Sequence, residues 1–599
     1  MQALSHAAAS VPPAGGAAVG ELVVASIVGA VMAAGLALFG FAHRKGSTQL
    51  LTKAGNLSER VSGIPGWASL PALIAGISLL VAVLGFYADV ATHIDNGRDP
   101  GPFANPFHYL IIFGLLGIAL AGYVSILLGS GDEDPRAVTV GASLLGEGWK
   151  VPIGGILLLV CGTIAVLGFP LDDVWHRLFG QDVTLWSPTH MQMVGGASLS
   201  TLALWILMTE ATRDVSGARR SRSLNLLLSF VAGSFLIGLS AFQAEFDYSV
   251  PQFRLLYHPI LLLLTAGAAL VPARICLGRG GALRSVVVFV GIRGLLTLVI
   301  GPVMGHSLPH FPLYIAEALA VEAVALRVST DRQLTFGAIA GVAIAVFGLP
   351  AEWAWSHVWT TIAWPSALLP GAVLFGLLAG VAGGVLGGYI GRALTDSRER
   401  QESPAWIAIA MAAGVLLCLA FPFPTDASLD ATATVALTPT ERAGWVNVDV
   451  TTEPADAASD ASWFNVTAWQ GGGSVLRELV AEGPGTYRAN GPVPVTGDWK
   501  TLIRFQKGKS ALAFPIYLPA DPAIPAKGVA ATPKRTAAFV ADKKIILREA
   551  KPVSSTLTVG ASIALGAIFL TWVFIMAWGL GRLQPPLPRG APRTMPTPA

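Results

Sequence analysis

Long uninterrupted apolar runs constrain the fold of this chain more than any other feature of its sequence. An α-helix needs about 20 apolar residues to cross the hydrocarbon core of a bilayer, and charged residues make up only 13% of the 599 residues. We therefore expect an all-α polytopic membrane protein with a lipid bilayer as its surroundings. Thirteen transmembrane helices are predicted, at 21–42, 67–88, 109–130, 151–169, 189–210, 224–242, 257–276, 285–304, 311–327, 334–350, 366–390, 405–421 and 556–579.

Residues 422–555 differ from the rest of the chain because they are polar and contain short alternating segments separated by turn signals such as GGGS. Several short strands at this spacing predict a β-sandwich inserted before the last helix. The stretch GTYRANGPVPVTGDWKTLIRF resembles small extracytoplasmic sandwich domains of the FixH/YtkA-like group, which are associated with copper and oxidase maturation. The block has no His, Cys or Met, so we interpret it as a docking or structural module.

The predicted domain organisation follows from these two regions. Residues 1–421 are expected to form the helical membrane domain, 422–555 the extracytoplasmic β-sandwich and 556–579 the final transmembrane helix, with 580–599 a disordered, Pro-rich cytoplasmic tail. Lys and Arg concentrate in alternate loops, which places those loops in the cytoplasm. We expect a multi-pass protein of a bacterial plasma membrane, with its N-terminus outside and its C-terminus in the cytoplasm. The net charge of +3 argues against nucleic acid as a partner.

Two stretches at the ends of apolar runs repeat one pattern of possible metal ligands. Each reads Asp, three residues, His, five residues, Asp, and then Pro-x-His. Residues four apart share a helix face, so the Asp and His of each copy are expected to point at one atom. The two copies are Asp89, His93, Asp99 and His108, and Asp172, His176, Asp182 and His190.

Two imidazoles and one carboxylate suit several metals. Such a set binds oxygen-activating iron, copper or catalytic zinc, and Met191 and Met193 beside His190 favour copper. The alternative is that Asp and His only cap helix ends at the membrane surface. Duplication of the whole spacing favours the metal, and the metal ligands predicted first are Asp89, His93, His108, Asp172, His176 and His190.

Four further residues are candidate ligands of lower rank. Asp247 and His258 form a degenerate third copy of the pattern, whereas His306 and His310 lie four residues apart in a short outer loop. For the second pair the alternative is a solvated turn.

The repeats resemble the C subunit of the copper membrane monooxygenases, the particulate methane and ammonia monooxygenase family. That subunit has Asp-x3-His on one membrane helix and Pro-x-His at the start of the next. Asp172, His176 and His190 match its better-known copper triad. The resemblance implies copper at both sites and oxidation of a small apolar molecule or ammonia. This chain departs from the family in its longer loops, its larger number of spans and its fused outer block.

Three functions compete at this stage. The first is a copper-binding membrane protein that oxidises a small apolar substrate with O2, with its catalytic residues unassigned. The alternative is a copper transport or delivery protein. The third is a scaffold for a respiratory or maturation complex, with protein partners bound through the sandwich; a homo-oligomer is a further alternative.

Two features of the membrane domain predict packing. Arg293 lies in an apolar run next to the one that holds Glu317 and Glu322, so we expect it to pair with one of them. Glycines every four residues share one helix face and allow another backbone to come close. They are Gly376, Gly380, Gly384 and Gly388.

Overall fold

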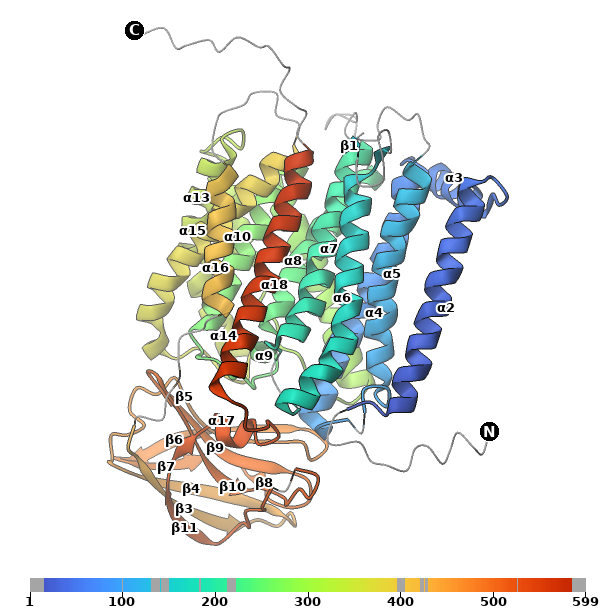
Figure 1. Cartoon of the computed structure of the whole chain (residues 1–599). Coiled ribbons are helices and arrows are strands. Elements are labelled where there is room, and N and C mark those ends of the chain that lie inside the picture. The colour runs from blue at the N-terminus through green and yellow to red at the C-terminus, as the bar shows by residue number, and fades with distance from the viewer. Residues whose placement is uncertain are drawn as a thin grey trace.

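The computed structural model describes residues 16–99, 101–130, 140–141, 150–181, 185–212, 222–395, 405–420, 425, 429–524 and 526–583. Within these residues, eleven helices are long and apolar enough to cross a membrane, and they stand side by side in one bundle (Figure 1). The chain is therefore a helical membrane protein. The main bundle elements are α2 (Val19–Arg44), α4 (Gly66–Asn96), α5 (Pro106–Gly129), α6 (Ile153–Phe179), α7 (Pro188–Thr212), α8 (Arg222–Ser240), α10 (Tyr257–Leu277), α11 (Gly281–Leu298), α13 (Gln333–Ala343), α14 (Leu349–Trp359), α15 (Leu369–Leu394) and α18 (Ser555–Arg582).

Shorter elements extend or connect these helices. The segment η5 has π-helical geometry and joins α13 to α14 in one span, while η4 extends α11 in the same geometry. The short elements are α3 (Leu50–Ser62), β1 (Val140–Gly141), β2 (Lys150–Val151), η3 (Ala241–Gln243), α9 (Ala244–Asp247), η4 (Val299–Val303), α12 (Ile315–Val324), η5 (Ile344–Gly348), η6 (Ser366–Leu368), α16 (Ala405–Ala420) and α17 (Lys543–Ile546).

Two of the thirteen predicted spans differ from the expectation. The run at 311–327 contains only α12, a helix of 10 residues. This helix begins late because Tyr314, just before it, has a left-handed backbone conformation (φ 57°), and the N–H groups of Leu313 and Tyr314 donate to Glu352 instead. The run at 405–421 forms α16, which has 16 residues and is shorter than the other bundle helices. The expected disordered tail at 580–599 lies outside the described residues except for 580–583, which continue α18 and end it.

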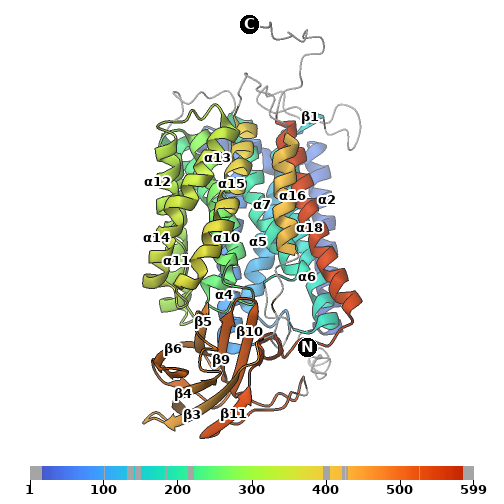
Figure 2. The ribbon, with the colours of Figure 1, turned by 90° about the vertical axis from the view of Figure 1, so that its left-hand side faces the viewer.

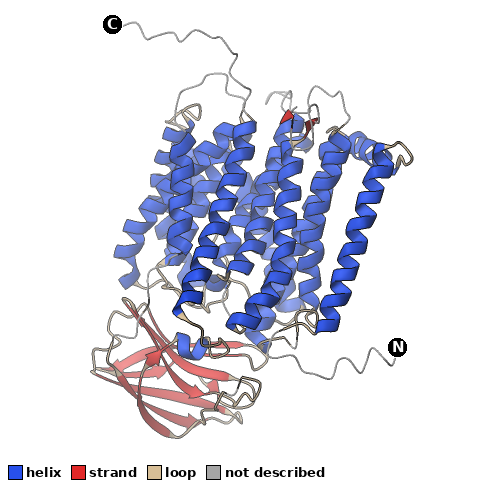
Figure 3. Ribbon diagram, viewed as in Figure 1, coloured by secondary structure: helices blue, strands red, loops and turns tan. Residues whose placement is uncertain are grey.

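The C-terminal block forms a β-domain in which two halves of one sheet pack face to face (Figure 3). The strand order is β11-β3-β4-β7-β6-β5-β9-β10-β12, with β8 paired to β4 and neighbours antiparallel. Alternation along β4 buries Val446, Val448 and Val450 in the core. The strands are β3 (Thr432–Pro439), β4 (Trp445–Glu453), β5 (Trp463–Trp469), β6 (Ser474–Gly483), β7 (Thr486–Ala489), β8 (Val493–Pro494), β9 (Lys500–Lys507), β10 (Ser510–Tyr517), β11 (Lys534–Ala538) and β12 (Val540–Ala541).

Glycines bring the backbones of α10, α13 and α15 into direct contact. A Cβ on Gly384 would lie 2.1 Å from the carbonyl oxygen of Gly337 on α13. On another face of α15, a Cβ on Gly383 would lie 2.3 Å from the carbonyl oxygen of Leu264 on α10. The predicted stripe is therefore confirmed as a packing surface, and Gly383 and Gly387 form a second one that the sequence reading did not single out.

Ion pairs in the bundle differ from the expected ones. Arg293 pairs with Asp247, with Nη2 and Oδ2 2.6 Å apart, and Glu322 pairs with Arg274 at 2.9 Å. The expectation that Arg293 meets Glu317 or Glu322 is wrong, because a short helix between two loops does not keep the depth that a full span would have.

The β-domain packs against one end of the bundle, the end at which α4 and α6 finish and α5 and α7 begin (Figures 1 and 2). Both predicted Asp/His sets lie at this end, on the same side as the β-domain. The helix α18 leads from the β-domain to the opposite end of the bundle (Figure 1).

Candidate metal centre

The two helices that carry the Asp-x3-His pairs end in the same way. On α4, His93 is followed four residues later by Gly97, whose N–H donates to the His93 carbonyl oxygen. On α6, Gly180 does the same for His176. Both glycines have φ near +85° (86° and 84°), a conformation that side chains other than glycine rarely adopt. The repeated motif is therefore Asp-x3-His-x3-Gly.

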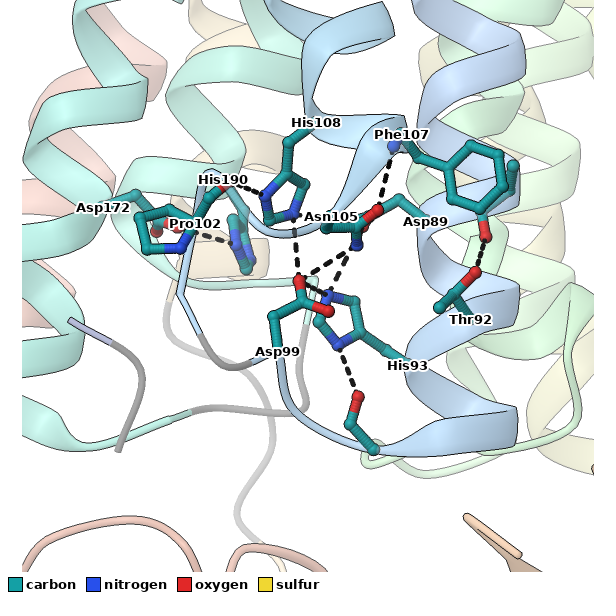
Figure 4. A network of polar contacts seen from close by, with 12 residues as sticks. Asp89, Thr92, His93, Asp99, Pro102, Asn105, Phe107, His108, Asp172 and His190 are labelled. Carbon is teal, nitrogen blue, oxygen red and sulfur yellow. Dashed lines mark hydrogen bonds and ion pairs between the residues drawn. The ribbon is translucent and has the colours of Figure 1, made fainter. Parts of the chain in front are cut away.

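The α4–α5 cluster consists of Asp89, His93, Asp99 and His108. The Nε2 atoms of His93 and His108 lie 3.4 and 3.1 Å from Oδ1 of Asp89. Asn105, the N-cap of α5, donates from Nδ2 to Asp89 (2.6 Å) and to Asp99 (3.0 Å). The side chains face one another across the loop, with His190 and Asp172 close by (Figure 4). Asn105 thus holds both carboxylates of the cluster in place.

The α6–α7 cluster consists of Asp172, His176 and His190. Oδ2 of Asp172 lies 3.1 Å from Nε2 of His176 and 3.5 Å from Nε2 of His190. Thr189 donates its hydroxyl to Oδ1 of Asp172 at 2.5 Å, and the Ser187 hydroxyl accepts the His190 N–H at the start of α7. Asp182, the fourth residue of this copy, lies outside the described residues.

The geometry of the donor atoms fits a metal ion. In each cluster, one ligand atom from every member lies within 4.8 Å of all the others. Nδ1 of His93, His108 and His176 faces a backbone carbonyl oxygen at 3.1, 2.6 and 3.3 Å. Because a carbonyl only accepts, Nδ1 carries the proton in each neutral ring, and Nε2 keeps its lone pair for a metal.

One cavity joins the two clusters. It has a volume of about 290 Å³ and is lined by the Asp and His side chains of both sets. Phe169, one turn before Asp172 on α6, packs edge-on against the His108 ring with ring centroids 5.7 Å apart. Most of the remaining wall is aliphatic and comes from α4, α5, α7 and α8, and residues of the β-domain close one side.

The lower-ranked pair Asp247 and His258 does not join either cluster. The Asp247 carboxylate accepts from Arg293, and Nδ1 of His258 accepts from the indole N–H of Trp364. The part of the chain that the structure describes places neither in a group of three metal-compatible donors.

His306 and His310 have separate local partners. Nδ1 of His306 lies 3.1 Å from Asp95, and Nδ1 of His310 lies 3.2 Å from the Asp247 carbonyl oxygen. Burial lowers the pKa of His310, which favours a neutral ring. Within the described residues both lie outside the two clusters.

Backbone groups of the β-domain region bond to the ends of both ligand-bearing helices. In the turn after β5, the N–H groups of Gln470 and Gly472 donate to the carbonyl oxygens of Ile94 and Asp95 on α4. In the segment before α18, the N–H of Lys551 donates to the Phe179 carbonyl oxygen on α6. These carbonyls belong to the last turn of each helix, where intrahelical partners are missing. The β-domain therefore helps to fix the helix ends that hold His93 and His176.

A charged contact adds to this docking. Arg98, next to Asp99 in the α4–α5 loop, donates two hydrogen bonds to Asp521 of the β-domain at 2.7 and 2.8 Å. The hydrogen bonds from Arg98 lower the pKa of Asp521. The ionised form of Asp521 is thus favoured in the folded protein.

Replacing Asp521 with Asn is expected to lower the free energy of unfolding by about 1 kcal/mol, since a half-buried bidentate ion pair stabilises the folded state more than an exposed pair does. Because the folded-state pKa lies below the unfolded value of about 3.9, this contribution is complete above that pH and is lost as the pH falls through the folded-state pKa. Thermal unfolding in detergent over a pH series measures both effects.

The matched control is Asp449→Asn, which removes the exposed Arg488–Asp449 pair inside the β-domain. This variant is expected to change stability by only a few tenths of a kcal/mol. An acid profile for Asp521→Asn identical to that of the unmodified protein would contradict a role of this pair in docking.

The fold and the two clusters define a class: a polytopic helical membrane protein whose extramembrane β-domain covers a pair of Asp/His clusters on a shared cavity. Comparison of the chain with protein-family models, with curated proteins and with solved structures gives no match.

Proposed function

We propose that this protein binds copper at the α4–α5 and α6–α7 clusters and oxidises a small apolar substrate with O2 in the cavity between them. The observation that carries the proposal is the duplicated Asp/His/His geometry around one cavity with largely aliphatic walls. An external reductant is required. It supplies two electrons, and with two protons one oxygen atom enters the product and the other leaves as water.

Copper is favoured among the metals that suit these donors. Imidazole nitrogen and carboxylate oxygen also accept iron or zinc, but Met193 lines the same cavity as His190 and adds a soft thioether. Copper, when bound, would supply O2 activation and the exchange of electrons.

The protein's own residues have separate roles in this proposal. Asp172 balances the metal charge and is oriented by Thr189, while His176 and His190 present Nε2. Aliphatic side chains around the clusters receive an apolar substrate and limit water. The resemblance to the copper membrane monooxygenase C subunit, carried by Asp172, His176 and His190, supports the same assignment.

The membrane orientation belongs to the same proposal. We place the N-terminus, both clusters and the β-domain outside, and the C-terminus in the cytoplasm, in agreement with the charge of the loops. This orientation counts thirteen crossings, of which α12 is a partial one and α16 a short one. Because the number is odd, the two termini lie on opposite sides of the membrane. The outer surface of the β-domain is where we place a protein partner such as an electron donor.

Metal analysis of the detergent-purified protein tests the proposal. The unmodified protein is expected to hold two copper ions, and the double variant His176→Ala/His190→Ala to hold one. The matched control is His357→Ala, since His357 is exposed and bonds within its own helix. Copper content that stays the same in the double variant would reject the α6–α7 site.

The alternative function, copper transport or delivery, is separated by a different measurement. Transport needs ligands along a path through the bilayer, whereas both metal-compatible groups found in the described residues lie at one end of the bundle. Protein reconstituted in vesicles is therefore expected to bind copper without carrying it inside. Copper accumulation in the lumen would favour the transporter.

A further inference from the structure

Glu317 occupies a space that a glycine creates inside the membrane domain. It lies in the first turn of α12 and is completely buried (0% exposed). The opposite wall is Gly348, the last residue of the π-helical segment η5, where an added Cβ would lie 2.5 Å from Oε1 of Glu317. A side chain at this position would require the Glu317 carboxyl group to move.

Neither oxygen of the Glu317 carboxyl group has a hydrogen-bond partner from another residue in the described structure. Glu322, five residues later on the same helix, is different: it pairs with Arg274 and accepts the N–H groups of Gly280 and Ala282 at 3.0 Å. An ionised carboxylate deep in a bilayer without a partner costs about 3 kcal/mol or more. In the described part of the chain, Glu317 therefore lacks partners from other residues that would compensate a negative charge, whereas Glu322 has them.

A second buried carboxyl group acts on Glu317. Glu352 on α14 is 4% exposed and interacts electrostatically with Glu317. Its Oε1 accepts the N–H groups of Leu313 and Tyr314 at 2.9 and 2.7 Å. These two backbone donors therefore bond to Glu352 and not to Glu317. Two interacting carboxyl groups in a medium of low dielectric constant do not readily ionise together. Among the described residues, Glu352 has donors from two other residues and Glu317 has none, so the proton is assigned to Glu317.

The cations on the neighbouring helices are engaged elsewhere. The elements packed against α12 are η5, α11, α13 and α10. Neither η5 nor α13 has a titratable side chain. The other two helices carry Arg and His side chains that have other partners: Arg293 bonds to Asp247, Arg284 to the Leu277 carbonyl, Arg274 to Glu322, and His258 to Trp364. Their remaining titratable groups also have contacts elsewhere, Cys276 with the Gly391 carbonyl and Tyr257 with the Phe253 ring.

Two further observations point to a functional position rather than a packing defect. Segments of π-helix are rare and occur frequently at functional sites, and two of them, η4 and η5, extend or join helices that pack against α12. A second buried polar group lies nearby: Gln243 donates to the side-chain hydroxyl of Tyr314 at 2.8 Å, and the backbone N–H of Tyr314 donates to Glu352. Oε1 of Gln243 is buried and has no partner in the described residues.

We propose that Glu317 is a proton-binding site of the membrane domain, which holds a neutral and exchangeable carboxylic acid beside Glu352. The ligand is the proton itself. The site lies apart from the two metal clusters, so this proposal does not depend on copper binding.

Infrared spectroscopy of the reconstituted protein at neutral pH tests this assignment. The spectrum of the unmodified protein minus that of Glu317→Gln is expected to show the C=O stretch of a protonated carboxyl group, shifted to lower frequency in D2O because the proton exchanges. Glu322→Gln on the same helix is the matched control. Its difference spectrum is expected to show loss of an ionised carboxylate and no protonated band.

Thermal unfolding adds a second readout. Since Gln copies the shape of a neutral Glu, Glu317→Gln is expected to keep the stability of the unmodified protein, whereas Glu322→Gln loses stability because Arg274 becomes unpaired. A carboxylate band lost in Glu317→Gln would overturn the proposal. So would a protonated band that does not shift after long exposure to D2O, or one that disappears when sodium is added at constant pH, which would assign a cation instead.

Discussion

Replacing Arg293 with Met is expected to lower the free energy of unfolding by about 3–5 kcal/mol, because it leaves the buried Asp247 carboxylate without its cationic partner. Both side chains are 1% exposed. The guanidinium also stacks on the Tyr87 ring, 3.9 Å from its centroid, and that contact is lost as well. Thermal and denaturant unfolding in detergent measure the change.

The double variant Arg293→Met/Asp247→Asn is expected to recover most of this loss, because Asn removes the uncompensated charge while keeping the shape of Asp. Arg332→Met serves as the control, since Arg332 is exposed before α13 and its replacement should stay within about 0.5 kcal/mol. Equal losses in the single and double variants would mean that the charge of Asp247 is not the cause.

Replacing Gly384 with Ala is expected to destabilise the bundle by about 3 kcal/mol, at the upper end of the range for overpacking. The added methyl would meet a backbone oxygen at 2.1 Å, and backbone atoms on both helices cannot rotate away as a side chain would. The helices α13 and α15 must then separate. Thermal unfolding and the yield of folded protein after detergent extraction report the effect.

Gly29→Ala on α2 is the matched control and has the opposite expected sign. Within the described residues, no atom lies within 4 Å of the position that its Cβ would take. Only the greater helix propensity of Ala then remains, about 1 kcal/mol in favour of the variant. If both variants lost stability equally, the effect would come from the loss of glycine as such and not from backbone contact.

Much of the membrane domain was predictable because one property, the length of an apolar run, determines whether a helix can span a bilayer. The prediction is less successful where tertiary contacts delay the start of a helix. The run at 311–327 is largely apolar, but Tyr314 has a left-handed backbone conformation. Its N–H and that of Leu313 donate to Glu352, 38 residues beyond Tyr314. A single apolar pattern does not contain that information.

The candidate site was predictable to the extent that helix geometry determines it. The spacing of Asp89 and His93, and of Asp172 and His176, places each pair on one face of a helix. The Pro-x-His segments begin the following helices at the same end of the bundle. The roles of Gly97 and Gly180 could also have been predicted, because each glycine follows the His of its copy by four residues. This repeated spacing was not used.

Other parts of the site had weaker signals or none. Asn105 stands directly before Pro106, as an N-cap often does, yet its bonds to Asp89 and Asp99 depend on how the loop folds. Thr189 differs from the residue at the equivalent position of the first copy, which is Phe107. The docking of Gln470 on α4 joins residues almost four hundred positions apart, and no local pattern predicts such a contact.

The bonds from Gln470, Gly472 and Lys551 to α4 and α6 also set an order of events during synthesis. Ribosomes complete both ligand-bearing helices long before they translate the β-domain residues that bond to the ends of these helices. A nascent chain therefore carries incompletely supported Asp/His clusters at the ends of α4 and α6 until the β-domain has been translated and folded. Completion of the two clusters therefore waits for the last part of translation, and under the proposed function copper binds after that point.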